Sequence, residues 1–159
     1  MIKNLNVKQL VISLLISLGV GILASILTAD SFMEYSGLIK PPLSPPAWLF
    51  PVVWTVLYIL MGVSAYMIYQ SNDDYKYVAL AIYGVQLIFN FLWSIIYFNL
   101  GNPLFAFVWL VMLWVLIVAM IISFAQINKT AALLQIPYLL WVTFAGYLNL
   151  ALYLLNNPI

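Results

Sequence analysis

The stretch YVALAIYGVQLIFNFLWSIIYFNLGNPLFAFVWLVMLWVLIVAMIISFAQIN, residues 77–128, contains 52 residues and no charged side chain. One membrane-spanning helix needs about 20 predominantly apolar residues, so this stretch is long enough for two. Gly101-Asn102-Pro103 interrupts it near the middle, and this tripeptide is typical of a turn. We therefore predict transmembrane helices over about 77–99 and 103–125.

The remaining charged residues divide the rest of the chain in the same way. Uncharged runs of 21, 32 and 30 residues follow Lys8, Lys40 and Lys129. Each run is long enough for one more span, and together they predict helices over about 9–29, 46–70 and 131–155. Only 6% of all residues are charged, against about a quarter in soluble domains. The predicted fold class is an all-α integral membrane protein, a five-transmembrane-helix bundle that forms a single transmembrane domain over residues 1–159.

Two alternatives to this interpretation are weaker. A transmembrane β-barrel would need many short segments of alternating polarity, whereas these runs are long and apolar on all sides. The first run could be a secretory signal peptide, but it is longer than a typical signal core, and Leu27 stands where a small residue is expected before cleavage. We therefore expect a retained first helix.

The lysines predict the orientation in the membrane. With five spans, the N-terminus, the loop over 71–77 and the loop over 126–130 lie on one side, and they carry four of the five lysines. Lys40, in the loop over 30–45, is the fifth. Because cytoplasmic loops are enriched in Lys and Arg, we predict a cytoplasmic N-terminus and an external proline-rich loop.

Polar and aromatic residues within the predicted spans recur at helical spacing. Such residues follow one face of three spans: Trp54, Tyr58, Met61 and Ala65 in the second, Tyr83, Gln86, Asn90, Trp93 and Tyr97 in the third, and Gln135, Tyr138, Trp141, Ala145 and Asn149 in the fifth. Amides can simply hydrogen-bond neighbouring helices together. Alternatively, aromatic faces with a few polar groups line a cavity for a flat apolar ligand. The presence of such a stripe on three helices favours the cavity.

The first span differs, because small residues recur on it every fourth position: Ser13, Ser17, Gly21 and Ser25. Such a ridge lets a neighbouring helix approach closely. We expect it to serve packing, with Ser25 near enough to the outer end to line a cavity.

Five prolines fall within IKPPLSPPAWLFPVVWTVLY, residues 39–58. Pro41, Pro42, Pro45 and Pro46 predict a stiff, extended connector that covers the cavity as a lid. Pro46 can begin the second helix. Pro51, about five residues further on, should then remove a backbone hydrogen bond and bend this helix.

Three segments, KPPLSPPAWLFPVVWTVLY, QLIFNFLWS and PYLLWVTFAGYLNLAL, resemble the tryptophan-rich sensory protein and translocator-protein family, also known as peripheral benzodiazepine receptors. The resemblance extends from about Gly19 to Asn156. It implies a membrane receptor or sensor in a bacterial cell membrane, commonly a homodimer, that is linked to tetrapyrrole metabolism. The implied ligands are porphyrins (protoporphyrin IX and haem) and drug-like isoquinoline-carboxamides or benzodiazepines.

The resemblance also implies functions for individual residues. The ligand-binding set would be Ser25, Tyr35, Pro45, Trp54, Tyr58, Asn90, Trp93, Tyr138, Trp141, Ala145 and Asn149. Trp54 and Trp141 match the tryptophans linked to light- and oxygen-dependent porphyrin degradation, and would be the catalytic pair. The sequence departs from the family pattern at Glu34, where a tryptophan usually precedes the tyrosine, and at Leu43, which stands where a tryptophan is common. No Lys or Arg follows Tyr153, so the animal members' sterol-binding motif is absent.

The composition excludes several classes of function. Without His or Cys, and without a carboxylate inside a span, conventional acid–base, thiolate and metal chemistry lack their usual residues. No basic cluster predicts nucleic-acid binding. A transporter is the alternative function, but no charged residue inside a span offers an ion-coupling site. We therefore expect a receptor for aromatic ligands in contact with membrane lipid, with no required cofactor and no metal site.

Overall fold

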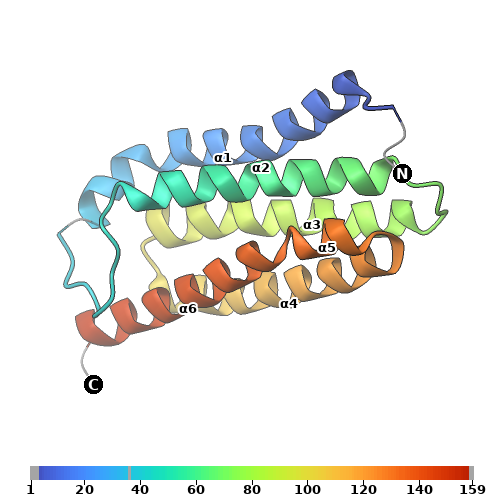
Figure 1. The fold of residues 1–159 in the computed structure, drawn as a ribbon. Coiled ribbons are helices and arrows are strands. Elements are labelled where there is room, and N and C mark those ends of the chain that lie inside the picture. Colours follow the sequence, from blue (N-terminus) through green and yellow to red (C-terminus); the bar gives the residue numbers. More distant parts are fainter. Residues whose placement is uncertain (1–3, 36, 158–159) are drawn as a thin grey trace.

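The computed structural model describes residues 4–35 and 37–157, with the side chains of residues 32–35 left out. The chain forms α1 (Val7–Tyr35), α2 (Leu49–Tyr69), α3 (Lys76–Ser94), the π-helix η1 (Ile95–Asn99), α4 (Pro103–Ile127), α5 (Lys129–Leu133) and α6 (Ile136–Asn156). Figure 1 shows the long helices side by side in one bundle, with the N- and C-termini at opposite ends. No strand occurs in the described residues, so the all-α fold class is confirmed.

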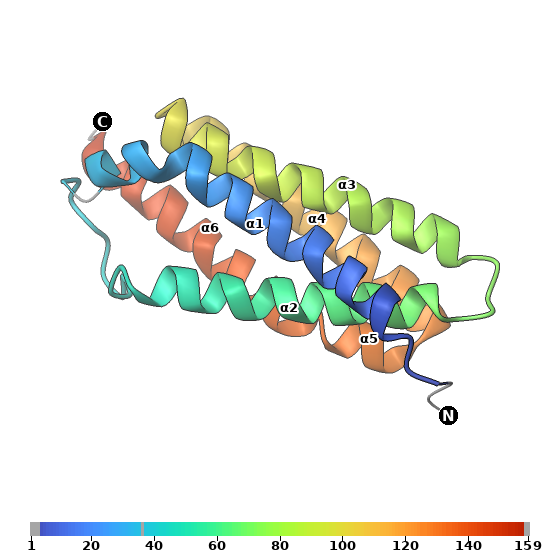
Figure 2. The ribbon, with the colours of Figure 1, turned by 90° about the horizontal axis from the view of Figure 1, so that it is seen from above.

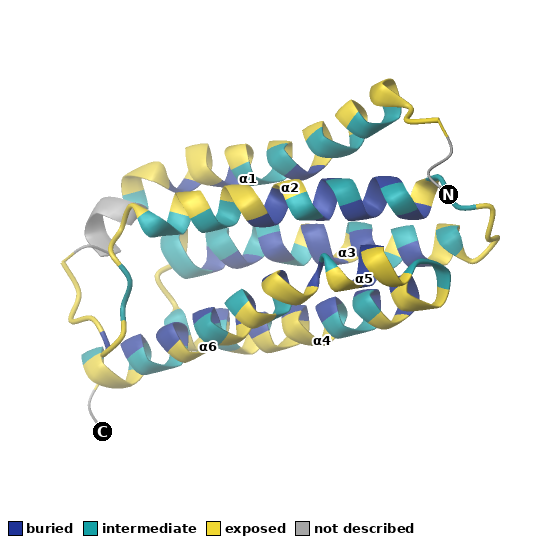
Figure 3. Ribbon diagram, viewed as in Figure 1, coloured by how far each residue is buried: buried dark blue, intermediate teal, exposed yellow. Residues whose placement is uncertain are grey.

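Five helical segments within the described residues are long and apolar enough to cross a membrane. They cover Val7–Ser31, Leu49–Tyr69, Lys76–Asn99, Pro103–Ile127 and Lys129–Asn156. Their outward faces are apolar, as Leu15, Ile26 and Leu140 show, each about two-thirds exposed. Figure 3 shows exposed residues on the outer faces of the bundle and buried ones between the helices. An apolar outer surface of this extent requires lipid around it, which confirms the five-span membrane protein.

Asparagine side chains cap the N-termini of α4 and α5. The predicted turn before α4 contains Gly101 at φ 59°, a conformation that glycine adopts without strain. The Asn102 side chain accepts a hydrogen bond from the Phe105 N–H (3.1 Å), and Pro103 occupies the first turn, where its missing N–H leaves no gap. Asn128 caps α5 in the same way through the Ala131 N–H (3.1 Å).

Small residues bring α1 and α2 into close contact, as predicted. Ser13 Oγ donates to the Gly62 carbonyl oxygen, and Ser17 Oγ to the Tyr58 carbonyl oxygen, each at 2.7 Å. A Cβ added at Gly62 would lie 3.0 Å from the Leu14 Cα, so the two backbones leave no room for a side chain there. Figure 2, seen from above, shows α1 lying diagonally across α2.

The expected bend at Pro51 does not occur. The second helix begins at Leu49, three residues later than predicted, and continues without interruption to Tyr69. Pro51 therefore lies in the first turn, where a backbone N–H has no partner within the helix in any case. Pro46 lies in the connector, and its carbonyl oxygen accepts a hydrogen bond from the Leu49 N–H (3.0 Å).

Two irregularities that the sequence analysis did not predict shape the ends of the bundle. The third span changes from α- to π-helix at Ile95, and the Leu100 N–H bonds to the Ile95 carbonyl oxygen (3.2 Å). The fifth span is broken between α5 and α6, two residues before Pro137. Pro137 lacks the N–H that would bond to the Leu133 carbonyl oxygen in a continuous helix, which explains the break.

Candidate functional site

A cavity of about 430 Å³ lies between α1, α2, α6 and the junction of α3 with η1. This junction is at the same end of the bundle as the proline-rich connector (Figure 1). The cavity is lined by Gly21, Ala24, Ser25, Thr28, Ala29, Ala47, Phe50, Pro51, Trp54, Tyr58, Trp93, Ser94, Tyr97, Phe98, Ala145, Leu148 and Asn149. None of these residues is an acid, a lysine or an arginine, so the wall is uncharged.

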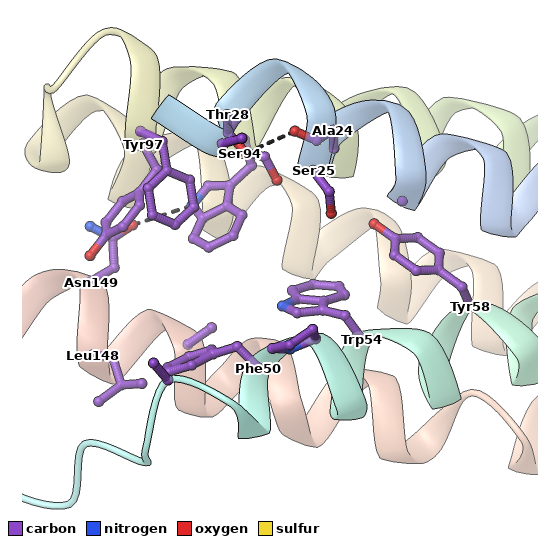
Figure 4. Close-up of a pocket in the computed structure, with 17 residues that line it drawn as sticks. Ala24, Ser25, Thr28, Phe50, Trp54, Tyr58, Ser94, Tyr97, Leu148 and Asn149 are labelled. Atoms are coloured by element: carbon purple, nitrogen blue, oxygen red, sulfur yellow. Dashed lines mark hydrogen bonds between the residues drawn. The ribbon is translucent and has the colours of Figure 1, made fainter. Parts of the chain in front are cut away.

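Trp54 is the central aromatic residue of the cavity. It lies in α2, and its ring centroid is 5.7 Å from that of Tyr58, with the planes inclined by 30°. The rings of Trp93 and Tyr138 lie 6.4 and 6.3 Å away, in tilted and edge-on arrangements. Aromatic pairs at these distances hold one another in place. Figure 4 shows the Trp54 indole between the two sides of the cavity.

A hydrogen-bonded chain fixes the base of the cavity. Tyr58 Oη donates to Asn90 Oδ1 (2.7 Å), and Asn90 Nδ2 donates to Tyr138 Oη (2.8 Å). Tyr138 Oη in turn donates to Gln86 Oε1 (2.7 Å). The chain joins α2, α3 and α6, and all four side chains are buried. In a medium without water, such a satisfied network holds its members in one arrangement.

The outer part of the cavity is fixed by a second set of contacts. Trp93 Nε1 donates to Asn149 Oδ1 (3.3 Å), and Asn149 Nδ2 donates to the Pro103 carbonyl oxygen (2.8 Å). Tyr97 stacks on Trp93 with the ring centroids 5.3 Å apart. Tyr97 and Phe98 both belong to η1, so the wider turn of the π-helix places two neighbouring aromatic residues in the cavity wall. Such π-segments often occur at functional sites.

The α1 wall is different, because it contributes only small side chains. Figure 4 shows Ser25 pointing toward Trp54 and Tyr58. Thr28 Oγ1 donates to the Ala24 carbonyl oxygen (2.8 Å), so its proton is already used within the helix. Gly21 faces the Tyr58 ring so closely that an added Cβ would lie 2.5 Å from Cε2. This wall therefore sets the width of the cavity.

The structure brings together a large part of the predicted ligand-binding set. The predicted residues that line the cavity are Ser25, Trp54, Tyr58, Trp93, Ala145 and Asn149. Asn90 and Tyr138 are not in the wall: they lie behind it and hold Tyr58 through the hydrogen-bonded chain. Asn90 and Tyr138 thus hydrogen-bond neighbouring helices together, and they also support Tyr58 from behind the cavity wall.

Three other predicted residues are placed differently. Pro45 is not among the residues that line the cavity, so its predicted contact as part of a lid is not seen. Trp141 does not line the cavity either. It packs edge-on against Phe50, with ring centroids 5.8 Å apart, and Phe50 is the aromatic residue in the wall. Tyr35 falls outside the described side chains. Their functions stay predictions.

Several lining residues were missed by the sequence analysis. Phe50 precedes Trp54 by four residues, as Trp54 precedes Tyr58, so helical spacing alone could have identified it. Phe98 could not be found in this way, because it reaches the wall through the π-helical turn. Ala29 follows Ser25 by four residues and continues the small-residue ridge of the first span, so the same spacing could have identified it.

Comparison with known proteins is consistent with this arrangement. The sequence matches the TspO/MBR family over residues 12–154. The chain belongs to the TspO/MBR family. The match covers all five spans except the first residues of α1 and the last two residues of α6.

Individual relatives of the TspO/MBR family are similar over almost the whole chain. Tryptophan-rich protein TspO of Archaeoglobus fulgidus is 40% identical, over 96% of this chain and 99% of its own length. Tryptophan-rich protein TspO of Chlorobaculum tepidum is 37% identical over the same shares. The bovine (Bos taurus) Translocator protein is 34% identical, over 86% of this chain and 83% of its own. As a TspO/MBR protein, the chain is an integral membrane protein of a sensor and translocator family.

Proposed function

We propose that the cavity around Trp54 is the binding site of a membrane receptor or sensor for flat aromatic ligands, with porphyrins as the principal class. The observation that supports this proposal is the wall itself: an uncharged cavity of about 430 Å³ with Phe50, Trp54, Trp93 and Tyr97 around it. Small-molecule sites are typically about 300–1,000 Å³ and are lined mainly by apolar and aromatic groups. Isoquinoline-carboxamide and benzodiazepine-type compounds also contain flat aromatic rings, and they form the second ligand class of this proposal.

The few polar groups of the wall would orient such a ligand. The Ser25 hydroxyl points into the cavity, as Figure 4 shows, and can donate a hydrogen bond to a carbonyl or ring nitrogen. Asn149 has less to offer, because its amide group is already bonded to Trp93 and to the Pro103 carbonyl oxygen. Ring stacking would therefore supply the affinity for the ligand, and the hydrogen bond from Ser25 would fix the orientation of the ligand in the cavity.

Recognition would depend on the ring system and not on a bound metal. Haem proteins hold iron through His, Cys, Met or Tyr, and this chain contains no His or Cys. Tyr58 and Tyr97 are the lining residues that could still reach iron, but Tyr58 already donates its proton to Asn90. We infer that iron-free protoporphyrin IX and haem bind with similar affinity and that no cofactor is needed.

Light- and oxygen-dependent porphyrin degradation is a second activity of the same site in this proposal. Trp54 would supply an electron to the light-excited porphyrin, with dioxygen as the terminal oxidant. Its position in the wall, stacked on a tyrosine that is hydrogen-bonded to Asn90, favours this function. Trp141 packs behind Phe50, which makes it the less direct donor.

A transporter remains the alternative function, and the character of the wall favours a receptor. Coupled transport generally needs ionisable residues in the membrane-embedded part. The lining residues include no Lys, Arg, Asp or Glu, so the cavity offers no such coupling group. The proposal also includes assembly of this receptor as a homodimer.

Titration of tag-free protein in detergent micelles tests the main proposal. Protoporphyrin IX and haem are added separately in the dark, and the porphyrin absorption band and tryptophan fluorescence are followed. We expect saturable binding of both, with quenched fluorescence, and displacement by an isoquinoline-carboxamide. Tight binding of haem with no binding of the iron-free ring would show that the metal is the anchor, and the aromatic-cavity proposal would have to be abandoned.

A further inference from the structure

The side-chain amide of Gln135 is buried at the break between α5 and α6. The residue is 0% exposed, and neither Nε2 nor Oε1 has a hydrogen-bond partner within the described part of the chain. An amide that loses its hydration without a new partner is strongly disfavoured, and such groups are rare in native proteins. Gln135 therefore calls for a partner that is not a side chain of this bundle.

A second buried polar group without a partner lies on α3. The Tyr83 hydroxyl makes no hydrogen bond within the described residues, although the residue is only 6% exposed. Ser17 Oγ lies near it and gives its own proton to the Tyr58 carbonyl oxygen (2.7 Å), so it can serve the phenol only as an acceptor and leaves the lone pairs of the phenol oxygen without a donor. The Tyr83 ring packs against Phe124, with ring centroids 6.3 Å apart, so the phenol is held in the bundle interior.

The helical register places Gln135 and Tyr83 about one turn before the two residues that a single hydrogen bond joins. Tyr138 and Gln86 are joined across α6 and α3 (2.7 Å). Gln135 precedes Tyr138 by three residues, and Tyr83 precedes Gln86 by three, so each lies about one turn earlier on a similar face. The Gln135 carbonyl oxygen accepts from the Leu139 N–H (3.1 Å), so the α6 register extends back to Gln135. Both helices run away from the end that holds the N-terminus (Figure 1), so both groups lie on that side.

We propose that Gln135 and Tyr83 form an internal water-binding site at the α5–α6 break. Buried water molecules typically make about three hydrogen bonds to polar groups that would otherwise lack partners. The amide offers two donors and an acceptor, and the phenol offers one of each, which suits a small neutral molecule that both donates and accepts. A metal ion does not fit, because neither residue can carry a negative charge at neutral pH.

The bound water would add a second polar layer about one turn away from the hydrogen-bonded chain at the base of the cavity. That chain runs from Tyr58, which lines the cavity, through Asn90 and Tyr138 to Gln86. With water at Gln135, polar contacts continue one turn further to the point where the fifth span is interrupted. This inference rests on the buried groups alone and does not depend on which ligand the cavity binds.

Water-selective NMR on the purified full chain, labelled with 15N at glutamine side chains, tests the site. We expect a nuclear Overhauser signal between water and the Gln135 side-chain NH2, assigned by its loss in Gln135→Leu. Gln86 is the matched control: it is equally buried but bonded to Tyr138 and in contact with Met61 Sδ, so its NH2 should give no such signal. A wild-type protein without the Gln135 signal would overturn the proposal.

A thermal double-mutant cycle then tests whether the two residues share the water. Tyr83→Phe and Gln135→Leu should each change Tm by roughly 2–4 °C, and the double variant should differ from the sum, because one water is lost only once. Tyr147→Phe, which removes a bond to the Pro42 carbonyl oxygen at the other end of the bundle, should be additive with Gln135→Leu. Additivity of Tyr83→Phe and Gln135→Leu refutes a shared site. Coupling without a water signal shows a direct bond between them and equally refutes it.

Discussion

The indole of Trp54 stacks on the phenol of Tyr58, one turn further along α2, with ring centroids 5.7 Å apart. Tyr58 is itself held by Asn90 on α3 through a hydrogen bond of 2.7 Å. The main aromatic surface of the cavity therefore rests on a side chain that cannot rotate without breaking a buried bond. The position of Trp54 thus depends in part on Asn90, which does not itself line the cavity.

Exchanging the two tryptophans separately should distinguish their functions. Trp54→Phe keeps much of the stacking area, so porphyrin affinity should fall by only about 1 kcal/mol. Phenylalanine is much harder to oxidise than indole, so bleaching of the porphyrin band under illumination should slow strongly. Trp141→Phe should have a smaller effect on both measurements, because Trp141 packs behind Phe50 and does not line the cavity. Equal bleaching rates in wild type and both variants would show that both tryptophans serve packing only and take no part in porphyrin degradation.

Ala145→Leu should block the cavity and leave the fold intact. Ala145 lines the wall on α6 and is 8% exposed, so three added carbon atoms have to enter the space that a ligand needs. We expect at least tenfold weaker binding of protoporphyrin IX and of an isoquinoline-carboxamide, measured by fluorescence titration. Ala81→Leu is the matched control, because Ala81 is exposed on the outside of α3. Equal affinities in the two variants would place the binding site elsewhere.

Asn90→Leu should destabilise the protein through the network and not through the cavity wall. The change leaves the buried Tyr58 hydroxyl without its acceptor, whereas Tyr138 keeps its bond to Gln86. One buried group without a partner costs about 1–3 kcal/mol. The Tm in micelles should fall accordingly, and Asn72→Leu, in the exposed loop between α2 and α3, should leave it nearly unchanged. An unchanged Tm for Asn90→Leu would mean that the chain of hydrogen bonds contributes nothing to stability.

Two glycine substitutions should differ sharply in effect. Gly62→Ala puts a Cβ 2.8 Å from Ser17 Oγ and 3.0 Å from the Leu14 Cα, so α1 and α2 have to separate. Strain of this kind costs about 1–3 kcal/mol. Gly84→Ala meets no atom within 4 Å and should be neutral or stabilising, since alanine favours helix by about 1 kcal/mol. Similar melting temperatures for both variants would contradict the close α1–α2 contact.

Cysteine labelling checks the orientation predicted from the lysines. Leu43 is 81% exposed in the connector before α2, and Asn72 is exposed at the other end of the bundle. In intact cells, an impermeant thiol reagent should label Leu43→Cys and reach Asn72→Cys only after lysis. The reverse pattern would place the N-terminus outside.

The sequence was sufficient to predict the spans because a membrane helix depends on properties that composition shows directly. Length, missing charge and the turn at Gly101 need no knowledge of neighbouring helices. The polar stripe on α3 was also predictable, since Gln86, Asn90 and Trp93 all face the interior. What the stripe could not show is whether a given side chain meets a cavity or another side chain. Asn90 and Trp93 share the stripe, yet only Trp93 lines the cavity.

Local backbone geometry accounts for the remaining differences. The prediction of a bend at Pro51 was wrong because the effect of a proline depends on where the helix begins. The helix begins at Leu49 and not at Pro46, so Pro51 lies in the first turn, where a missing N–H costs no hydrogen bond. The break before Pro137 and the π-turn at Ile95 change the register within a span. Patterns of three and four residues assume a constant register, so they could not place Phe98 in the wall.

The division of the cavity between small residues on α1 and aromatic residues on the other helices has an evolutionary consequence. Substitutions at Ala24, Ser25 or Ala29 can narrow or widen the space without removing a ring, whereas substitutions at Trp54 or Trp93 change the ring surface without moving the α1 backbone. If the cavity is the proposed binding site, the thickness and the chemistry of its ligand are set at separate positions. Under the proposed function, a lineage would then acquire a bulkier pigment or a slimmer drug-like compound through single exchanges on α1, with the aromatic half of the cavity inherited unchanged.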